Sequence, residues 1–545
     1  MKHGFKSTAA VVFVILAVVR VVSTGYGQSV STLPPQTSNA QSRISANNDP
    51  VIQKILAEAR DNSQLYPLAQ ELLDSIGPRL TASIEQKRAT DWALALYRRW
   101  GIPVRAEQYG TWMQWRRGIT QIDLIAPRIR PLEGMLSTWS PGTKGTVEGP
   151  VVLFPKIQTP AEFEAALPQV RGKFVLFSLP WPSCRPDTNW KEFATPESFG
   201  RMQNERKEAF DKWYTGRLRK SGLRGTALIQ RLADAGALGI VTLLVPPPGP
   251  QGWGTYKIST TIAEKIPEVG LGCEDYGLVF RLAENNQGPI LRVNANAEFT
   301  GEVPVSNVVA ELRGSEKPDE FVVLSGHFDS WDPASGATDN GSATVMMMEA
   351  MRILKAVYPN PKRTILAAHW SGEEQGLNGS GAFAADHPEI VSGMQVLLNQ
   401  DSGTGRVVKI SMQGFTGAGN SFRQWLSQMP NEMTRDINLV DPGTPGGGSD
   451  EMSFVCHGVP AFSLDSQRWD YEAYTWHTNR DTFDKLIFDD LKYNAMLVAM
   501  LAYLAAEDPR RVPREHATTI DPKTGRPTPW PSCGPPARNW AQRRK

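Results

Sequence analysis

The sequence predicts an α/β protein in which helices cover a mainly parallel sheet, with a β-rich segment inserted into the chain. From residue 299 to residue 510, nearly continuous apolar runs alternate with helical patterns, as expected for a parallel sheet that is buried on both faces. Residues 121–298 differ, because short β-like runs there alternate with prolines and glycines. With 545 residues, the chain is also too long for one ordinary domain.

The first 48 residues predict an export signal and a disordered tether. Residues 1–27 have a basic start, an apolar stretch over 9–22 and small residues near Gly27, where we expect cleavage. An uncleaved membrane anchor is the alternative, although the apolar stretch is short for a spanning helix. Residues 28–48 are rich in Ser, Asn, Gln and Pro and predict disorder. We therefore expect a secreted or periplasmic protein.

Residues 49–120 predict helices. The apolar residues over 51–59 have helical spacing, and a second helix is predicted over 84–100. Ser83 and Gln86 have the spacing of a capping box at its start.

The inserted segment, 121–298, predicts a small sheet with at least one helix. Strands are expected within 149–155, 172–180 and 240–244, and a helix is expected over 226–237. The charged stretch 185–222 is expected to be a surface elaboration.

The second half of the chain predicts five strands and a buried helix. The helix is expected over 343–357, with Met346–Met348 filling the core. The expected strands are 321–326, 363–370, 394–401, 406–412 and 459–465. Residues 511–545 form a tail that is rich in Pro and Arg and has no periodicity.

Composition excludes several classes of partner and site. A formal charge of +2 gives no electrostatic reason to expect nucleic acid or an anionic membrane as a partner. The four cysteines form no CxxC or CxH pattern, which excludes a cysteine-rich zinc site. A Cys184–Cys273 disulfide is one expectation in an oxidising compartment, and four unpaired thiols are the alternative.

Acidic and imidazole side chains follow several of the predicted strands. In open parallel sheets, ligands bind at the carboxyl ends of the strands, so we expect these residues to meet at one edge. They are His327 and Asp329 after 321–326, Asp339 before the helix, Glu373 and Glu374 after 363–370, Asp401 after 394–400, and His477 after 459–465.

This set of residues favours a two-metal site. Two imidazoles and three carboxylates suit zinc, but they are too many for a single catalytic ion with an open position. A hydrolytic site also needs a base, so the neighbours Glu373 and Glu374 are expected to divide the two roles. Asp329, two residues after His327, is expected to hold the second nitrogen of that imidazole.

The motifs "HFDSWDPASGATDNGSAT", "SGEEQGLNGS", "NQDSG" and "WHTNRDTFDKL" resemble the co-catalytic zinc exopeptidases, which include secreted bacterial aminopeptidases and plasma glutamate carboxypeptidase. The resemblance covers roughly residues 50–505. It implies a zinc exopeptidase fold, with its N-terminal part at 49–120 and its catalytic part at 299–510. "GTALIQRLADAGALGIVTLLV" and "IPEVGLGCEDYGLVFRL" resemble a protease-associated domain, which would occupy 121–298.

Carried over to this sequence, the resemblance assigns a role to each residue. Asp339 would bridge two zinc ions; His327 and Asp401 would complete one, and Glu374 and His477 the other. Glu373 would be the general base, and Asp329 would support His327. The implied reaction is hydrolysis of a peptide substrate by a hydroxide bound to both metals.

The sequence departs from some relatives next to its last histidine. Trp476 stands where those relatives have a tyrosine that stabilises the oxyanion, so Tyr474, another residue or the metals are expected to take this role. The Gly446–Gly448 run resembles the segment that borders the substrate pocket; a flexible loop is the alternative.

Several functions are consistent with these patterns. An exported aminopeptidase or dipeptidase is the first expectation, and a carboxypeptidase of the same family is its alternative. A glutaminyl cyclase with one zinc ion and a non-catalytic binding protein are alternatives from other classes. Cobalt or manganese as the native metal and a homodimer as the native assembly are left open.

Overall fold

The computed structural model describes residues 49–243, 263–520 and 525–543. The predicted signal at 1–27 and tether at 28–48 lie outside the described residues. Residues 45–545 form one compact unit. Among the described residues, no helix has the length and apolar character needed to cross a membrane.

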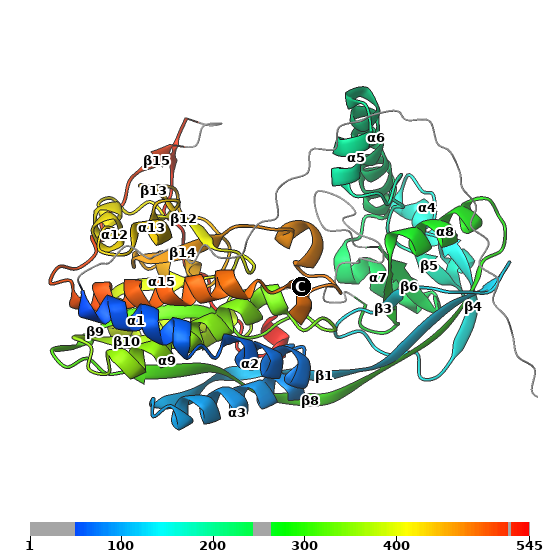
Figure 1. Ribbon diagram of the computed structural model, residues 1–545. Coiled ribbons are helices and arrows are strands. Elements are labelled where there is room, and N and C mark those ends of the chain that lie inside the picture. Colours follow the sequence, from blue (N-terminus) through cyan, green and yellow to red (C-terminus); the bar gives the residue numbers. More distant parts are fainter. Residues whose placement is uncertain (1–48, 244–262, 521–524, 544–545) are drawn as a thin grey trace, which may run out of the picture. The chain divides into compact units, whose positions relative to one another are not determined.

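Fourteen strands form one sheet, in the order β13-β12-β14-β11-β9-β10-β8-β4-β5-β6-β7-β3, with β1 paired to β8 and β2 paired to β1 (Figure 1). In chain order they are β1 (Val104–Ala126), β2 (Arg130–Pro131), β3 (Gly134–Leu136), β4 (Val147–Leu153), β5 (Phe174–Leu176), β6 (Gly239–Thr242), β7 (Glu268–Leu271), β8 (Ile290–Leu312), β9 (Lys317–His327), β10 (Arg363–Trp370), β11 (Met394–Asn399), β12 (Val407–Ser411), β13 (Asn438–Val440) and β14 (Ala461–Ser466).

The strands expected in the second half of the chain form the part of the sheet that carries the predicted site. β10 and β11 both pair with β9 in parallel, and β11 also pairs with β14 in parallel. Antiparallel pairs occur where β8 meets β10 and where β12 meets β14. The predicted α/β class with a mainly parallel sheet is therefore confirmed.

Helices cover this sheet. α9 (Ser342–Val357) and α15 (Phe488–Glu507) contact its strands, and α1 (Pro50–Asp61) packs against both helices (Figure 1). Met346–Met348 of α9 are fully buried, as their apolar run predicts. The predicted helix over 84–100 is α3 (Ile84–Arg99), where Ser83 Oγ accepts a hydrogen bond from Gln86 N at 2.9 Å.

A long antiparallel ribbon of β1 and β8 runs from this region into the inserted segment. Its register extends from Val104, opposite Ala310, to Ala126, opposite Ile290. The predicted boundaries of the insertion, at 120/121 and 298/299, therefore fall inside continuous strands. Backbone pairing joins the inserted segment to the rest of the sheet.

The inserted segment contains more helix than its predicted β-rich character implies. Strands were predicted within 149–155, 172–180 and 240–244, where β4, β5 and β6 lie, and β4 to β7 pair in parallel. Residues 185–222 are largely helical, because Thr195 caps a 15-residue helix there. The helices are α4 (Pro160–Ala166), α5 (Asp187–Phe193), α6 (Pro196–Phe210), α7 (Gly225–Asp234) and α8 (Cys273–Glu284).

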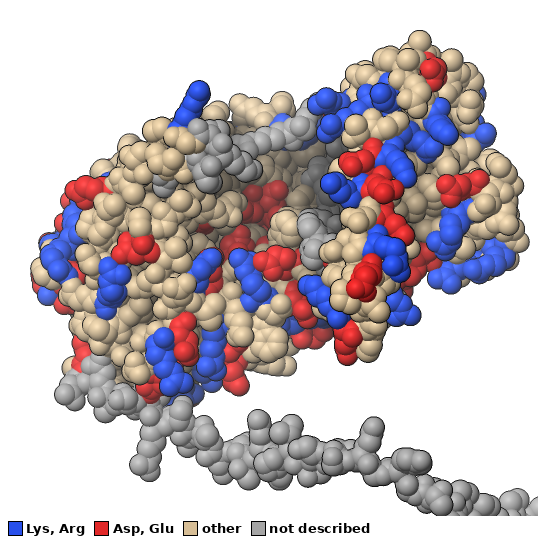
Figure 2. Space-filling model, turned by 90° about the horizontal axis from the view of Figure 1, so that it is seen from above, with Lys and Arg blue, Asp and Glu red and all other residues tan. Residues whose placement is uncertain are grey.

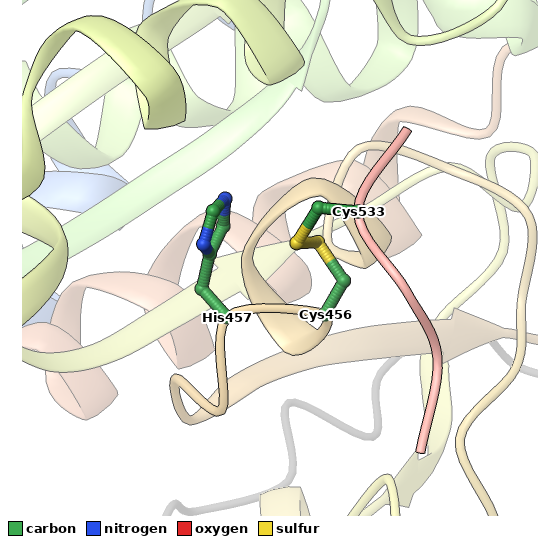
Figure 3. Close-up of side chains that lie close together, drawn as sticks. All are labelled: Cys456, His457 and Cys533. Carbon is green, nitrogen blue, oxygen red and sulfur yellow. A yellow bond between two sulfur atoms is a disulfide. The ribbon is translucent and has the colours of Figure 1, made fainter. Parts of the chain in front are cut away.

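Two disulfides join distant parts of the chain. Cys184 is bonded to Cys273 within the inserted segment, as expected. Cys456 is bonded to Cys533, a pair that the sequence analysis does not predict (Figure 3). The second bond ties the Pro- and Arg-rich tail to the turn after α14 (Met452–Val455). The tail therefore belongs to the folded unit, although it has no periodic pattern.

Candidate metal centre

The seven predicted site residues gather at the carboxyl edge of four neighbouring strands. β14, β11, β9 and β10 lie side by side and are parallel, so the residues that follow them meet at one edge of the sheet. In the space-filling view, acidic side chains gather in a hollow on one face of the molecule (Figure 2).

Asp339 lies between the two histidines. Its Oδ1 is 3.2 Å from His327 Nε2, and its Oδ2 is 3.3 Å from His477 Nε2. His327 Nε2 is also 3.2 Å from Asp401 Oδ1, and His477 Nε2 is 2.9 Å from Glu374 Oε2. Each imidazole therefore faces one carboxylate of its own and shares Asp339 with the other.

These contacts define two sets of three ligand atoms. Atoms of His327, Asp339 and Asp401 lie within 4.8 Å of one another, and so do atoms of Asp339, Glu374 and His477. Because Asp339 belongs to both sets, the arrangement suits two ions that share a carboxylate. Nitrogen and oxygen are also the donors that zinc takes in enzymes.

Buried carboxylate oxygens without hydrogen-bond partners further support a cation at this place. Asp339 Oδ2 and Glu374 Oε1 are buried, and neither has a hydrogen-bond partner in the described chain. Burying an ionised carboxylate is costly unless it is paired or coordinates a metal. The residues present therefore fit the zinc ions that the sequence implies.

Glu373 lies beside this centre and belongs to neither set. Its carboxylate is within 4.8 Å of ligand atoms of His327 and Glu374. Glu373 thus forms a further group with His327 and Glu374, and this group does not include Asp339. Glu374 is therefore grouped with Asp339 and His477, whereas Glu373 is not, and the division of roles between the two glutamates stays a prediction.

Burial dominates the electrostatics of the glutamate pair. It raises the pKa of Glu373 well above the usual carboxyl range, and the charges of Asp401 and Glu374 add to this effect. Burial and the charge of Asp339 likewise raise the pKa of Glu374. Burial also acts to raise the pKa of Asp401, but the charge of His327 and a hydrogen bond from its ring lower it. A bound cation would favour the ionised form of all three.

Asp329 supports the centre differently from the expectation. The backbone carbonyl of Asp329 accepts from His327 Nδ1 at 2.9 Å, whereas its carboxylate Oδ1 is 3.9 Å from that nitrogen. The carboxylate instead accepts from the backbone N–H groups of Glu373, at 3.2 Å, and Glu374, at 3.3 Å. Asp329 therefore orients the histidine through its main chain and holds the glutamate turn through its side chain.

Residues 79–81 bind the loop that follows β9. The sequence did not lead us to assign this segment to the site. Arg79 is completely buried and donates to the carbonyl oxygens of Phe328 at 2.8 Å, Ser335 at 2.6 Å and Gly336 at 3.1 Å. Thr81 Oγ1 donates to the Asp329 carboxylate at 3.1 Å. The only signal in the sequence was the "GPRLT" stretch at 77–81, which precedes the helix predicted over 84–100.

Asp481 is another functional neighbour that the sequence analysis missed. Its carboxylate accepts from the backbone N–H groups of Thr338, at 2.7 Å, and Asp339, at 3.0 Å, and so fixes the main chain of the shared ligand. Burial, and then the charge of Asp339, raise the pKa of Asp481 to about 7. Its position four residues after His477 was the available signal.

A cavity of about 1040 Å³ opens onto the centre. Glu373, Glu374, Asp339, Asp401 and His477 line one side of it, and the Gly446–Gly448 run lines another. Trp476 and Tyr471 also border this cavity, whereas Tyr474 borders a neighbouring cavity of about 220 Å³. The glycine run thus adjoins the space where a substrate would meet the predicted ligands.

A second group of metal-type side chains is not a metal site. Cys456, His457 and Cys533 lie close together, but the two sulfurs are joined in a disulfide (Figure 3). These two cysteines therefore offer no thiolate ligand.

The segment of the chain that matches a known protein family contains this centre. The model of peptidase family M28 matches residues 307–502, which include every predicted ligand. Residues 307–502 of the chain belong to peptidase family M28. As an M28 member the protein is a hydrolase of the metallo-exopeptidase type, and the predicted family is confirmed.

Similarity to M28 proteins extends beyond the matched segment. The chain is 25% identical over 511 residues to carboxypeptidase Q of Rattus norvegicus, covering 92% of this chain and 99% of the rat protein. It superposes on an M28 peptidase precursor from Shewanella amazonensis with a TM-score of 0.62 at 24% identity, covering 85% and 97% of the two chains. A zinc aminopeptidase from Bacillus subtilis gives 0.52 at 19% identity, covering 82% and 94%. The two structures show the same fold.

We predict that Asp329→Asn weakens zinc binding about 10- to 100-fold. The backbone N–H of Glu373 or Glu374 would then face the side-chain NH₂ group of the asparagine instead of a carboxylate oxygen. Thr81→Val is the matched control, since it removes one contact to the same carboxylate and leaves both amide contacts. Zinc affinity, measured by competition with a chelator, checks the prediction. Equal affinities for Asp329→Asn and the unaltered protein would contradict it.

Proposed function

We propose that this protein is an exported exopeptidase that binds two zinc ions and removes residues from a free end of a peptide, as an aminopeptidase or dipeptidase. The observation that carries the proposal is the position of Asp339, whose two carboxylate oxygens face two different histidines. His327 and Asp401 would complete one zinc site, and Glu374 and His477 the other. When bound, the ions supply Lewis-acid polarisation of the peptide carbonyl and make water a stronger acid.

Glu373 is the proposed general base. It lines the cavity beside the two ligand sets without joining either of them. From there its carboxylate takes the proton of the attacking water and passes it to the leaving amine. Glu374 lies 2.9 Å from His477 and is the ligand of the pair. Asp329 keeps both glutamates in place through their backbone amides.

Tyr471 is the proposed hydrogen-bond donor to the oxyanion. It would take the role of the tyrosine that some relatives have at the position of Trp476. It borders the cavity at the centre together with the predicted ligands and also borders the neighbouring cavity, which Tyr474 borders too. Burial, and then the negative charges of Asp339 and Asp401, raise the pKa of the Tyr471 phenol, so that it stays protonated and able to donate.

The charges of the cavity favour a substrate with a free amine. Its two cationic side chains other than histidine are paired, Lys409 with Asp465 at 2.7 Å and Arg468 with Glu472 at 2.7 Å. Glu451 also lines the cavity, and its Oε1 has no hydrogen-bond partner in the described chain. Lys409 and Arg468 are the groups that a carboxypeptidase would use, so this activity is the second candidate.

Two further features fit the proposal. The disulfides Cys184–Cys273 and Cys456–Cys533 are of the kind that persists in oxidising compartments, which supports export. The four parallel strands and the α7–β6 unit of the inserted segment are consistent with a protease-associated domain over 121–298.

Peptides blocked at one end test the proposed activity. We expect cleavage of a peptide with a free amine and a blocked carboxyl, and no cleavage of its counterpart with a blocked amine. A chelator should abolish cleavage, and added zinc should restore it, because the carboxylates of the centre need a cation. Product analysis by mass spectrometry checks this. Cleavage that requires only a free carboxyl would support the carboxypeptidase instead.

Glu373→Gln is expected to lower kcat about 10²- to 10⁴-fold, because the amide has no basic oxygen to accept the proton. Bound zinc should remain at two ions per chain, since Glu373 is not a proposed ligand. Glu374→Gln is the comparison, and it should lose zinc as well as activity. If instead Glu373→Gln lost zinc and Glu374→Gln retained it, the two roles would have to be exchanged.

Tyr471→Phe is expected to lower kcat about 10²- to 10³-fold with little change in KM, as the loss of one oxyanion donor does elsewhere. The matched control is Tyr474→Phe, which should retain kcat because its phenol borders the other cavity. Steady-state kinetics of both variants check the prediction. A larger loss in Tyr474→Phe than in Tyr471→Phe would reverse this assignment.

A further inference from the structure

Trp331 contacts two of the predicted metal ligands and is not assigned to the reaction by any of the motifs. It lies in the loop after β9, two residues beyond Asp329, and is 9% exposed. Its indole N–H donates to Glu374 Oε2 at 2.6 Å, and its ring centre is 5.8 Å from that of His477. Trp331 therefore contacts both Glu374 and His477, the two residues that would bind one of the zinc ions and not the other.

Trp331 holds the same oxygen of Glu374, Oε2, that lies 2.9 Å from His477 Nε2. An indole N–H can only donate a hydrogen bond. It therefore binds a carboxylate oxygen as acceptor, and it cannot accept a hydrogen bond from a protonated carboxyl group. Hydrogen bonds to an ionised carboxylate are also stronger than those between neutral groups. With Oε2 held, Glu374 Oε1 is the oxygen without a hydrogen-bond partner in the described chain. Trp331 therefore limits the rotation of a predicted ligand.

Other tryptophans pack behind Trp331 and come from distant parts of the chain. Trp139 of the inserted segment lies 6.4 Å from Trp331 between ring centres, at an angle of 78°. Trp540 of the tail lies 5.3 Å from Trp139, and Trp112 of β1 lies 5.6 Å from Trp540. These four residues, called the tryptophan cluster below, connect the tail to Glu374 through a continuous series of ring contacts.

The tail is held firmly where it enters the tryptophan cluster. The side chain of Arg538 pairs with Asp386 at 2.7 Å, and its backbone carbonyl accepts from Thr111 N at 2.8 Å. Arg543 pairs with Glu264 at 2.8 Å, and its guanidinium carbon lies 4.0 Å from the ring centre of Trp540. Trp540 is thus fixed between contacts on both sides of it in the sequence.

We propose that Trp331 is a positioning residue for Glu374 and that the C-terminal tail, through Trp540 and Trp139, keeps it in place. The inference rests on the proposed zinc site, since Glu374 matters here as a ligand. It gives the tail a role in metal binding and turnover that its lack of periodicity conceals.

Trp331→Phe tests the first step, because phenylalanine keeps an aromatic ring but removes the N–H. Trp190→Phe is the matched control, since the Trp190 N–H is buried and has no hydrogen-bond partner in the described chain. We expect Trp331→Phe to weaken binding of one of two zinc ions about 10- to 100-fold, and Trp190→Phe to leave both unchanged. Titration of the metal-free full-length protein with zinc by calorimetry measures both affinities without relying on activity.

Trp540→Ala tests the role of the tail. It should weaken the same zinc ion, and the double variant with Trp331→Phe should bind zinc as Trp331→Phe alone does, because the effects of residues acting through one contact do not add. Trp530→Ala is the control: Trp530 also anchors the tail, by donating to the Val455 carbonyl at 2.8 Å, but it lies outside the tryptophan cluster. It should lower thermal stability without changing zinc affinity.

Steady-state kinetics complete the test. In saturating zinc, Trp331→Phe should lower kcat more than it raises KM, and an unaltered kcat with normal zinc affinity would overturn the inference. Fully additive effects of Trp331→Phe and Trp540→Ala would overturn the role of the tail. If the unaltered protein bound no zinc, the proposed function would fail and the inference with it. Two tightly bound ions in both the unaltered protein and Trp331→Phe would overturn the inference alone.

Discussion

Negative charge gathered in a buried place is the constraint on which the rest of this structure depends. Asp339, Asp401, Glu373 and Glu374 converge on one edge of the sheet, where two imidazoles face them. Carboxylates brought together out of water repel one another and lose hydration, so the arrangement is unfavourable unless a cation enters it. With the proposed ions bound, the stability and the function of the site would depend on the same cations, and the surrounding chain would have to keep the ligands in place before the metal binds.

The chain meets this requirement mainly with backbone groups. Arg79 binds carbonyl oxygens of the loop after β9, Asp481 accepts from the amide of the shared ligand, and Asp329 accepts from both glutamate amides. Contacts of this kind fix the main chain and leave the ligand side chains for the metal. They also explain why the N-terminal helices, far from the site in sequence, belong to the same domain.

The strands, and the meeting of the acidic and imidazole residues that follow them, were predictable because they depend on local patterns and one general rule of topology. The apolar runs that became β9, β10, β11 and β14 are visible in the sequence, and parallel pairing brings their carboxyl ends together.

Residues whose role depends on contacts between distant segments were not predictable in this way. Trp331 matters because it meets Glu374, and its place depends on Trp139 and Trp540, which no periodicity relates to it. The division of Asp329 between a carbonyl for His327 and a carboxylate for the glutamate turn likewise depends on backbone geometry. The Cys456–Cys533 bond was missed because the tail was treated as a segment outside the fold.

The ribbon of β1 and β8 also affects how the chain folds during synthesis. β1 ends at Ala126 and its partner β8 begins only at Ile290, so the whole inserted segment must be made before the two strands can pair. Until then only Asp123 and Leu124 of this 23-residue strand have a strand partner, in β2, and unpaired strand edges are prone to aggregate. Contacts between such distant residues also form slowly. Export before folding would keep this exposed strand away from other nascent chains in the cytoplasm.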